Sequence, residues 1–307
     1  MDTLIGFVEW FTVPLQFEFV QRALLVSVVA GVVCAVLSCW MTLVGWSLMG
    51  DAVSHAVLPG VVLSFMFGLP FALGALVFGA GSVALIGVVN RTSRVKEDAV
   101  IGVVFTAMFA LGLVMISRVP SQTDLGHILF GNVLGVSDSD IVQVLLLAAV
   151  VLAVVWYKHR DLTMYAFDPV HAHAIGVNPR LLETLLLGLL SVTVVVALQA
   201  VGIILVVAMV IVPGATAYLL TDRFERMLLI SAAVAVLAAI VGVLGSFHLN
   251  ASTGGCIVLA QTCAFALAYL FSPRHGLLRR GRARRSPPRP SGRAARHRLN
   301  KMFNIFR

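Results

Sequence analysis

Charged residues are scarce in this sequence, and the motifs of several enzyme classes are absent. Only 12% of the 307 residues are Asp, Glu, Lys or Arg, and none of these occurs from Ala52 to Asn90. The sequence has no GxxxxGK[ST] phosphate loop and no HExxH pair, which argues against an ATPase or a metallohydrolase built on those motifs. The cysteines form no CxxC pair and lie in apolar runs, so we expect free, buried thiols rather than disulfides or a thiolate metal site. They are Cys34, Cys39, Cys256 and Cys263.

Apolar residues dominate what is present. Hydrophobic residues make up 60% of the chain, and the mean hydropathy is +1.00. A helix needs about 20 apolar residues to cross a bilayer, and the charge-free runs are long enough for one or two crossings each. We therefore predict an all-α, polytopic bundle of about nine spans, with eight or ten as alternatives because some turn signals are weak. The expected helices cover roughly residues 20–46, 50–67, 70–90, 99–118, 141–158, 182–200, 202–220, 227–246 and 254–272.

Lysine and arginine are unevenly divided between the expected loops. Alternating spans place only Arg22 and Arg118 on one side of the membrane. Because positive residues accumulate in cytoplasmic loops, we expect the other side to be cytoplasmic, with the N-terminus outside and the C-terminus inside. The residues expected on the cytoplasmic side are Arg91, Arg94, Lys96, Lys158, Arg160, Arg180, Arg223 and Arg226.

The formal charge of +8 comes from the C-terminal end of the chain. Residues 274–307 hold 12 of the 22 basic residues and no acidic one. This segment is too polar and too rich in Pro and Gly to form a core. We therefore predict a transmembrane domain over residues 1–278 and a disordered, basic cytoplasmic tail over residues 279–307 that lies against anionic lipid. No nucleic-acid partner is expected, because no base-reading module accompanies the arginines.

One carboxylate and one imidazole stand out in the apolar sequence. Asp51 and His55 are four residues apart, so on a helix they lie on the same face. A carboxylate inside the bilayer costs roughly 2.5–3.5 kcal/mol, and one that is kept there usually faces a protein interior, a water path or an ion. An oxygen and a nitrogen ligand together suit a divalent transition metal. We predict that Asp51 and His55 bind a passing metal ion; the alternative is a polar pair that only holds helices together.

The longest expected cytoplasmic loop, residues 158–180, contains a candidate docking helix. Asp168 and Pro169 are typical of an N-cap and a first helical position, and Gly176 is typical of a helix end. We expect this helix to dock into a groove on a soluble partner; the alternative is a connector that lies at the membrane surface. Joint metal binding by His171 and His173 is not expected, because residues two apart on a helix point in different directions. The residues assigned to docking are Asp168, Pro169, His171, Ala172, Ile175 and Gly176.

Five separated sequence segments are informative together, because they follow one another in a fixed order and each lies at a position compatible with the expected spans. They are Leu48–Gly60, Lys96–Phe105, Phe130–Val136, Asp168–Asn178, and Ser252–Leu259 leading to Pro273–Gly276. Together they resemble the integral membrane permeases of ABC importers for manganese, zinc and chelated iron. The resemblance covers about residues 15–278 and leaves out the arginine-rich tail.

The resemblance implies a transport subunit of the bacterial plasma (inner) membrane and not an enzyme. A separate cytoplasmic ATP-binding-cassette ATPase would hydrolyse ATP and contact Asp168–Asn178, and an extracytoplasmic metal-binding protein would deliver the ion. In this family, the residues that match Asp51 and His55 line the metal path where two permease copies meet. A dimer would then supply two carboxylates and two imidazoles for Mn(II), Fe(II) or Zn(II). No tightly bound cofactor is expected besides the transported ion.

Manganese is the first expected cargo, because residues 131–136 and 253–256 are similar to the manganese and iron branch of the family. The ligand types do not decide the cargo, since a site that carries manganese often holds zinc more tightly. The alternative function is a proton-coupled secondary metal carrier, which would also place Asp and His inside the membrane. Such a carrier is expected to show inverted repeats, and the C-terminal half has no second Asp-x-x-x-His.

Overall fold

The computed structural model of the protein describes residues 12–118 and 137–272. Regular structure within these ranges is helical throughout, which confirms the predicted all-α class. The helices, in chain order, are α2 (Glu18–Val44), α3 (Ser47–Ala56), α4 (Leu58–Phe67), α5 (Phe71–Thr92), α6 (Glu97–Arg118), α8 (Asp138–Phe167), α9 (Pro169–Ala174), α10 (Pro179–Val201), α11 (Ile203–Leu220), α12 (Phe224–Leu249) and α13 (Thr253–Phe271).

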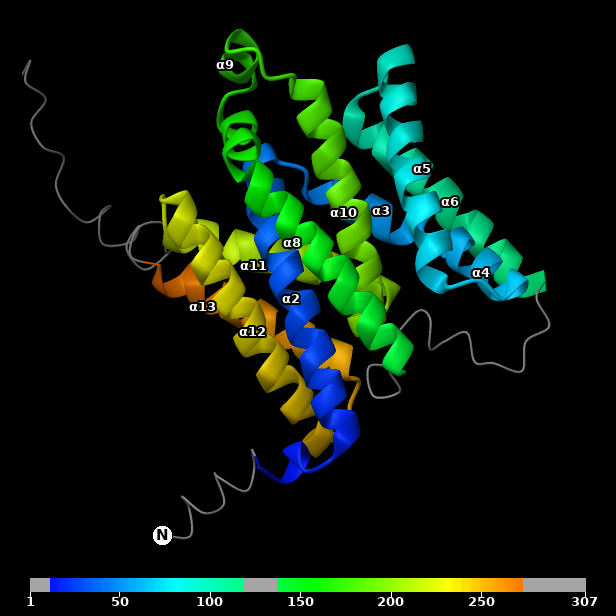
Figure 1. The fold of residues 1–307 in the computed structure, drawn as a ribbon, viewed down its shortest axis with the longest axis vertical. Coiled ribbons are helices and arrows are strands. Elements are labelled where there is room, and N and C mark those ends of the chain that lie inside the picture. Colours follow the sequence, from blue (N-terminus) through cyan, green and yellow to red (C-terminus); the bar gives the residue numbers. More distant parts are fainter. Residues whose placement is uncertain (1–11, 119–136, 273–307) are drawn as a thin grey trace, which may run out of the picture.

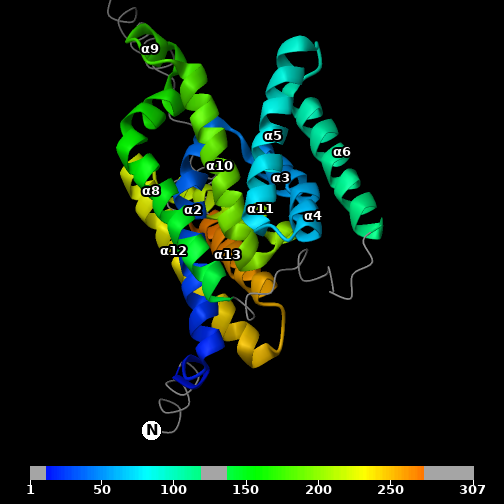
Figure 2. The ribbon, with the colours of Figure 1, turned by 45° about the vertical axis from the view of Figure 1, so that its right-hand side comes forward.

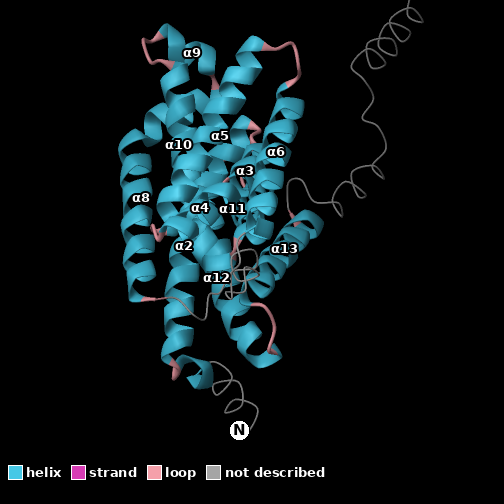
Figure 3. Ribbon diagram, turned by 90° about the vertical axis from the view of Figure 1, so that its right-hand side faces the viewer, coloured by secondary structure: helices cyan, strands magenta, loops and turns pink. Residues whose placement is uncertain are grey.

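Eight stretches of the described residues are long and apolar enough to cross a membrane. The short helices α3 and α4 together provide one of them, Leu48–Phe67. Helix α11 adds a shorter apolar stretch, Val206–Leu220, in the place where a ninth span was expected. The prediction of a polytopic helical bundle is therefore confirmed, and Figure 3 shows the helices running roughly along one common axis.

Successive spans run in opposite directions, and contacts at the two ends of the bundle demonstrate this. At one end, Phe167 at the close of α8 packs on Phe224 at the start of α12, with ring centroids 6.4 Å apart. Ser272, which follows α13, donates a hydrogen bond to the last turn of α11 at the same end. At the opposite end, Phe17 before α2 lies 5.5 Å from Phe247 near the close of α12. We call the first of these ends, which carries α9, the α9 end, and we call the opposite one the far end (Figure 1).

The basic residues divide between the two ends as the alternation of spans requires. The eight residues that were expected on one side fall in the α5–α6 turn, the last turns of α8 and the starts of α10 and α12, all toward the α9 end. Arg22 and Arg118 belong to the far end. The start of α2 and the close of α13 therefore lie at opposite ends of the bundle. The tail at 279–307 and the segment Phe130–Val136 lie outside the described residues.

Helix α2 is the centre of the bundle, and small residues let its neighbours approach closely. A Cβ atom on Gly31 would lie 3.6 Å from the Cβ of Ala235 on α12. The Oγ of Ser231 on α12 donates to the carbonyl of Ala35 at 2.8 Å, and the Oγ of Ser38 accepts from the N–H of Gly214 on α11 at 2.9 Å. Without a hydrophobic driving force in lipid, such close packing and interhelical hydrogen bonds hold helices together.

Two local predictions were wrong. Helix α8 was expected to end at residue 158 but continues to Phe167, because no Gly or Pro interrupts it and Leu162 and Tyr165 are buried. An ion pair of 3.0 Å between Lys158 and Asp161 lies on this extension. All four cysteines are free as expected, but Cys256 is only partly buried and Cys263 is exposed.

A broken helix with two polar residues and an exposed candidate docking helix

Proline divides the predicted helix at residues 50–67 into α3 and α4. Helix α3 ends at Ala56 and α4 begins at Leu58, with Pro59 in its first turn. Because proline has no N–H group, the carbonyl of His55 loses the donor that an uninterrupted helix would give it. Gly60 follows, and a Cβ atom there would collide with the carbonyl oxygen of Gly74 on α5. The break therefore lies where α4 and α5 pack backbone to backbone.

Asp51 and His55 lie on one face of α3, as the spacing predicted. The Nδ1 atom of His55 is 3.1 Å from Oδ1 of Asp51 and 3.0 Å from the Asp51 carbonyl oxygen. Ser54 donates its hydroxyl to the same carbonyl at 2.9 Å. When Nδ1 carries the proton and donates a hydrogen bond to Asp51, the lone pair of Nε2 is free to bind a metal ion.

Helix α6 positions the imidazole level with its own middle turns. The ring centroid of His55 lies 5.7 Å from that of Phe105 and 5.1 Å from that of Phe109, both in edge-to-face geometry. These phenylalanines occupy the middle of the 22-residue helix α6. His55 is therefore level with the centre of a span. Leu58 also contacts α6, because a Cβ atom on Gly112 would lie 2.7 Å from its side chain.

We call the side of α3 that carries Asp51 and His55 its ligand face, after the role predicted for the pair, and this face is open at the surface of the chain. The side chain of Asp51 is 34% exposed and that of His55 is 19% exposed. Leu48, one turn earlier on the same face, is 51% exposed. Within the described residues no group of three or more His, Cys, Asp or Glu side chains could hold a metal ion. The pair thus brings one carboxylate and one imidazole together on a face that other molecules can reach.

The candidate docking helix has the local structure that its sequence predicted. Asp168 caps α9, since its Oδ1 accepts from the N–H of His171 at 2.9 Å, and Pro169 is the first helical residue. Ala172 is fully buried against the chain. Gly176 ends the segment with a positive φ of 88°, a conformation that favours glycine.

Helix α9 presents apolar side chains to its surroundings at the tip of the molecule. Val170 is 79% exposed and Ile175 is 52% exposed, as is Phe167 immediately before the helix at 62%. Figure 2 shows α9 above the bundle, attached through α8 and α10. His171 and His173 are exposed as well and contribute no ligand cluster in the described part of the chain.

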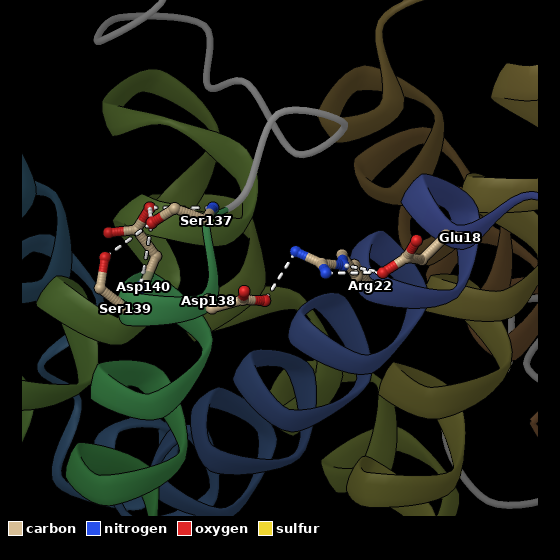
Figure 4. A network of polar contacts seen from close by, with 6 residues as sticks. All are labelled: Glu18, Arg22, Ser137, Asp138, Ser139 and Asp140. Atoms are coloured by element: carbon tan, nitrogen blue, oxygen red, sulfur yellow. Dashed lines mark hydrogen bonds and ion pairs between the residues drawn. The ribbon is translucent and has the colours of Figure 1, made fainter.

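A polar network at the far end was not predicted from the sequence. Arg22 on α2 bonds Glu18 at 2.6 Å and Asp138 on α8 at 2.7 Å, which ties together two helices distant in the sequence (Figure 4). Asp138 is placed by a capping box in which Ser137 and Asp140 bond each other's backbone N–H groups. The Ser-x-x-Asp spacing was a usable signal for this helix start.

Comparison with known proteins identifies the family. The model of the ABC 3 transport family matches residues 16–272. The manganese transport system membrane protein MntB of Synechocystis is 50% identical over 284 residues, which cover 92% of this chain and 93% of that protein. The chelated iron transport system membrane protein YfeD of Yersinia pestis is 48% identical over 259 residues, which cover 84% and 87%.

A solved structure agrees with this match over nearly the whole described fold. The structure titled PsaBC from Streptococcus pneumoniae in complex with Fab superimposes with a TM-score of 0.83 at 37% identity, covering 90% of this chain and 99% of that chain. Fold, span pattern and sequence similarity thus point the same way. The chain belongs to the ABC 3 transport family and is a multi-pass plasma-membrane permease subunit.

Proposed function

We propose that this permease carries a divalent transition metal ion into the cytoplasm, with manganese as the first cargo and Fe(II) and Zn(II) as further ones. The observation that carries the proposal is the Asp51–His55 pair on the open face of α3, level with the middle of α6. The names of the relatives support manganese and chelated iron as cargo. The chain itself is expected to hold no resident cofactor.

The ion path lies between two copies of the chain in this proposal. One chain offers one carboxylate and one imidazole, and both remain partly exposed. A second copy facing the first would bring two oxygen and two nitrogen ligands to one ion, a set that suits Mn(II), Fe(II) and Zn(II). Phe105 and Phe109 would then exclude water from one side of each imidazole and fix its orientation.

The two ends of the bundle take different partners. The α9 end faces the cytoplasm, because it carries most of the basic residues of the loops, and its exposed helix α9 contacts a separate ATP-binding-cassette ATPase. The far end faces outward and receives the ion from an extracytoplasmic metal-binding protein. The N-terminus is then outside and the C-terminus inside.

The test is metal uptake into proteoliposomes that contain the chain with and without its ATPase. With the ATPase, ATP and the metal-binding protein, we expect Mn²⁺ to accumulate against its gradient. Without the ATPase, we expect no flux when a proton gradient is applied. Proton-driven accumulation by the chain alone would contradict the proposal and indicate a secondary carrier. Accumulation of zinc but not manganese would keep the importer and change the cargo.

A further inference from the structure

A groove runs between α5 and α10 on the surface of the bundle. Its volume is about 290 Å³, and its walls carry small residues, among them Ala80, Ala84 and Gly87 on α5 and Gly188 on α10. Cβ atoms on Gly87 and Gly188 would meet no other atom within 4 Å, so both positions face open space. The two helices pack against each other, and Figure 2 shows them side by side.

The groove extends through about one leaflet of the bilayer. It runs from Arg91, in the last turn of α5, to Ala80, which at 1.5 Å per residue is about 16 Å along the helix. On α10 it runs from Glu183, in the second turn, to the buried Ser191. Half of a hydrocarbon core is about 15 Å thick. The charged residues therefore lie at headgroup level, and the small residues lie at the depth of an acyl chain.

The two charges at the mouth of the groove have opposite signs and are separate from each other. Arg91 and Glu183 both line the groove. In the part of the chain that the structure describes, four ion pairs occur, and neither residue belongs to any of them. A headgroup with a phosphate and an ammonium group would satisfy both side chains at once, since guanidinium binds phosphate and carboxylate binds ammonium.

The groove lies behind the ligand face of α3 and not on it. A Cβ atom on Gly79 of α5 would lie 3.6 Å from Val53 of α3, 3.2 Å from Val57 at the break after α3, and 3.5 Å from Ser191 of α10. Val53 and Val57 are buried, whereas Asp51 and His55 lie on the partly exposed side of α3. A second copy seated over Asp51 and His55 would therefore leave the groove facing lipid.

We propose that this groove binds one phospholipid with a primary ammonium headgroup, such as phosphatidylethanolamine, in the leaflet at the α9 end. The lipid phosphate bonds Arg91, the ammonium group bonds Glu183, and one acyl chain lies along Ala84, Gly87 and Gly188. This site is independent of the proposed metal cargo, because it requires only that the chain spans a membrane.

The test is native mass spectrometry of the full-length chain after incubation with equal amounts of phosphatidylethanolamine and phosphatidylglycerol. We expect one bound phosphatidylethanolamine per chain. Gly188→Leu and Gly87→Leu fill the groove and should remove the lipid, whereas Gly81→Leu is a matched control because its Cβ also meets nothing within 4 Å but Gly81 does not line the groove. Arg91→Gln should weaken both lipids by about fivefold, and Arg94→Gln, outside the groove, should not.

Glu183→Gln is the most specific variant. Because phosphatidylglycerol has a phosphate but no ammonium group, this variant should lose the preference for phosphatidylethanolamine and still bind a lipid through Arg91. Equal lipid retention by the unchanged chain, Gly188→Leu and Arg91→Gln would overturn the proposal. It would also be overturned if Gly188→Leu converted a dimer to a monomer, since a second copy would then cover the groove.

Discussion

The ligand face of α3 and helix α9, which we propose as the docking helix, are held by the rest of the chain in opposite ways. Helix α3 packs against α5, α6, α10 and α11, and two phenylalanines of α6 fix the ring of His55. Helix α9 packs against α8 and α10, and the apolar residues Val170 and Ile175 remain exposed there. An ion of fixed coordination needs a rigid frame, whereas a docking helix needs an accessible surface. Substitutions in the two regions should therefore separate transport from assembly.

The largest effect is expected at the ligand face. Asp51→Ala or His55→Ala should reduce metal uptake more than about 100-fold, because loss of a direct ligand exceeds the 10- to 100-fold cost of losing an outer contact. Insertion into the membrane should be unchanged or easier, since a carboxylate is removed from the bilayer. Uptake by cells and co-purification of the ATPase measure the two properties. Leu48→Ala, on the same face, is the control and should transport normally. Near-normal uptake by both Asp51→Ala and His55→Ala would show that these residues do not bind the transported ion.

The next effect is expected at the proposed docking helix α9. Here the ATPase should be lost from the purified complex, whereas the variants at the ligand face should keep it. Ala172→Pro removes the N–H group that bonds the Asp168 carbonyl at 3.1 Å, and it breaks the helix at a cost of about 3 kcal/mol. Co-purification of the ATPase should fall at least about tenfold, and transport should fall with it. Val170→Asp tests the surface without breaking the helix, and His173→Ala is the control. If the ATPase still binds both Ala172→Pro and Val170→Asp, α9 is only a connector.

A smaller effect is expected where α4 packs on α5. Gly60→Ala places a methyl group against the Gly74 carbonyl and should destabilise the chain by about 1–3 kcal/mol. Gly81→Ala on α5 faces open space and should leave stability unchanged. Thermal unfolding of the purified chain in detergent measures both. Equal unfolding temperatures for the two variants would show that stability does not depend on the close packing of α4 against α5 at Gly60.

The smallest effect is expected at the C-terminus. Truncation after Leu278 removes 11 of the 22 basic residues but none of the described helices. The remaining loop residues preserve the orientation, so uptake should stay within about twofold of the full chain, or roughly 0.4 kcal/mol. Uptake assays and protease accessibility of the new terminus check this. Lost transport at normal expression would assign the tail a role in the transport cycle.

The parts of this structure that follow from local sequence were predictable, and the parts that follow from packing were not. Charge-free runs predicted the spans, and the i, i+4 spacing predicted that Asp51 and His55 share a face, because both depend on neighbouring residues alone. The break at Val57 was missed although Pro59 marks it, since an apolar run of span length also fits one straight helix.

Contacts between distant helices left little trace in the sequence. The phenylalanines beside His55 belong to an apolar helix in which Phe105 and Phe109 resemble any lipid-facing residue, and only the packing of α3 on α6 selects them. The pair of Arg22 and Asp138 likewise depends on α2 meeting α8. The extension of α8 was missed because Lys158 and Asp161 suggested a loop, whereas they pair on a helix that continues beyond the apolar span.

The most direct test of the ion path is the number of Mn²⁺ ions bound per chain, measured by electron paramagnetic resonance on the purified complex with the ATPase. We predict one tightly bound ion for every two chains, because within residues 12–118 and 137–272 each chain is proposed to supply Asp51 and His55 alone, and we predict no such ion in Asp51→Ala. One ion for every chain, or an ion that persists in Asp51→Ala, would contradict this prediction.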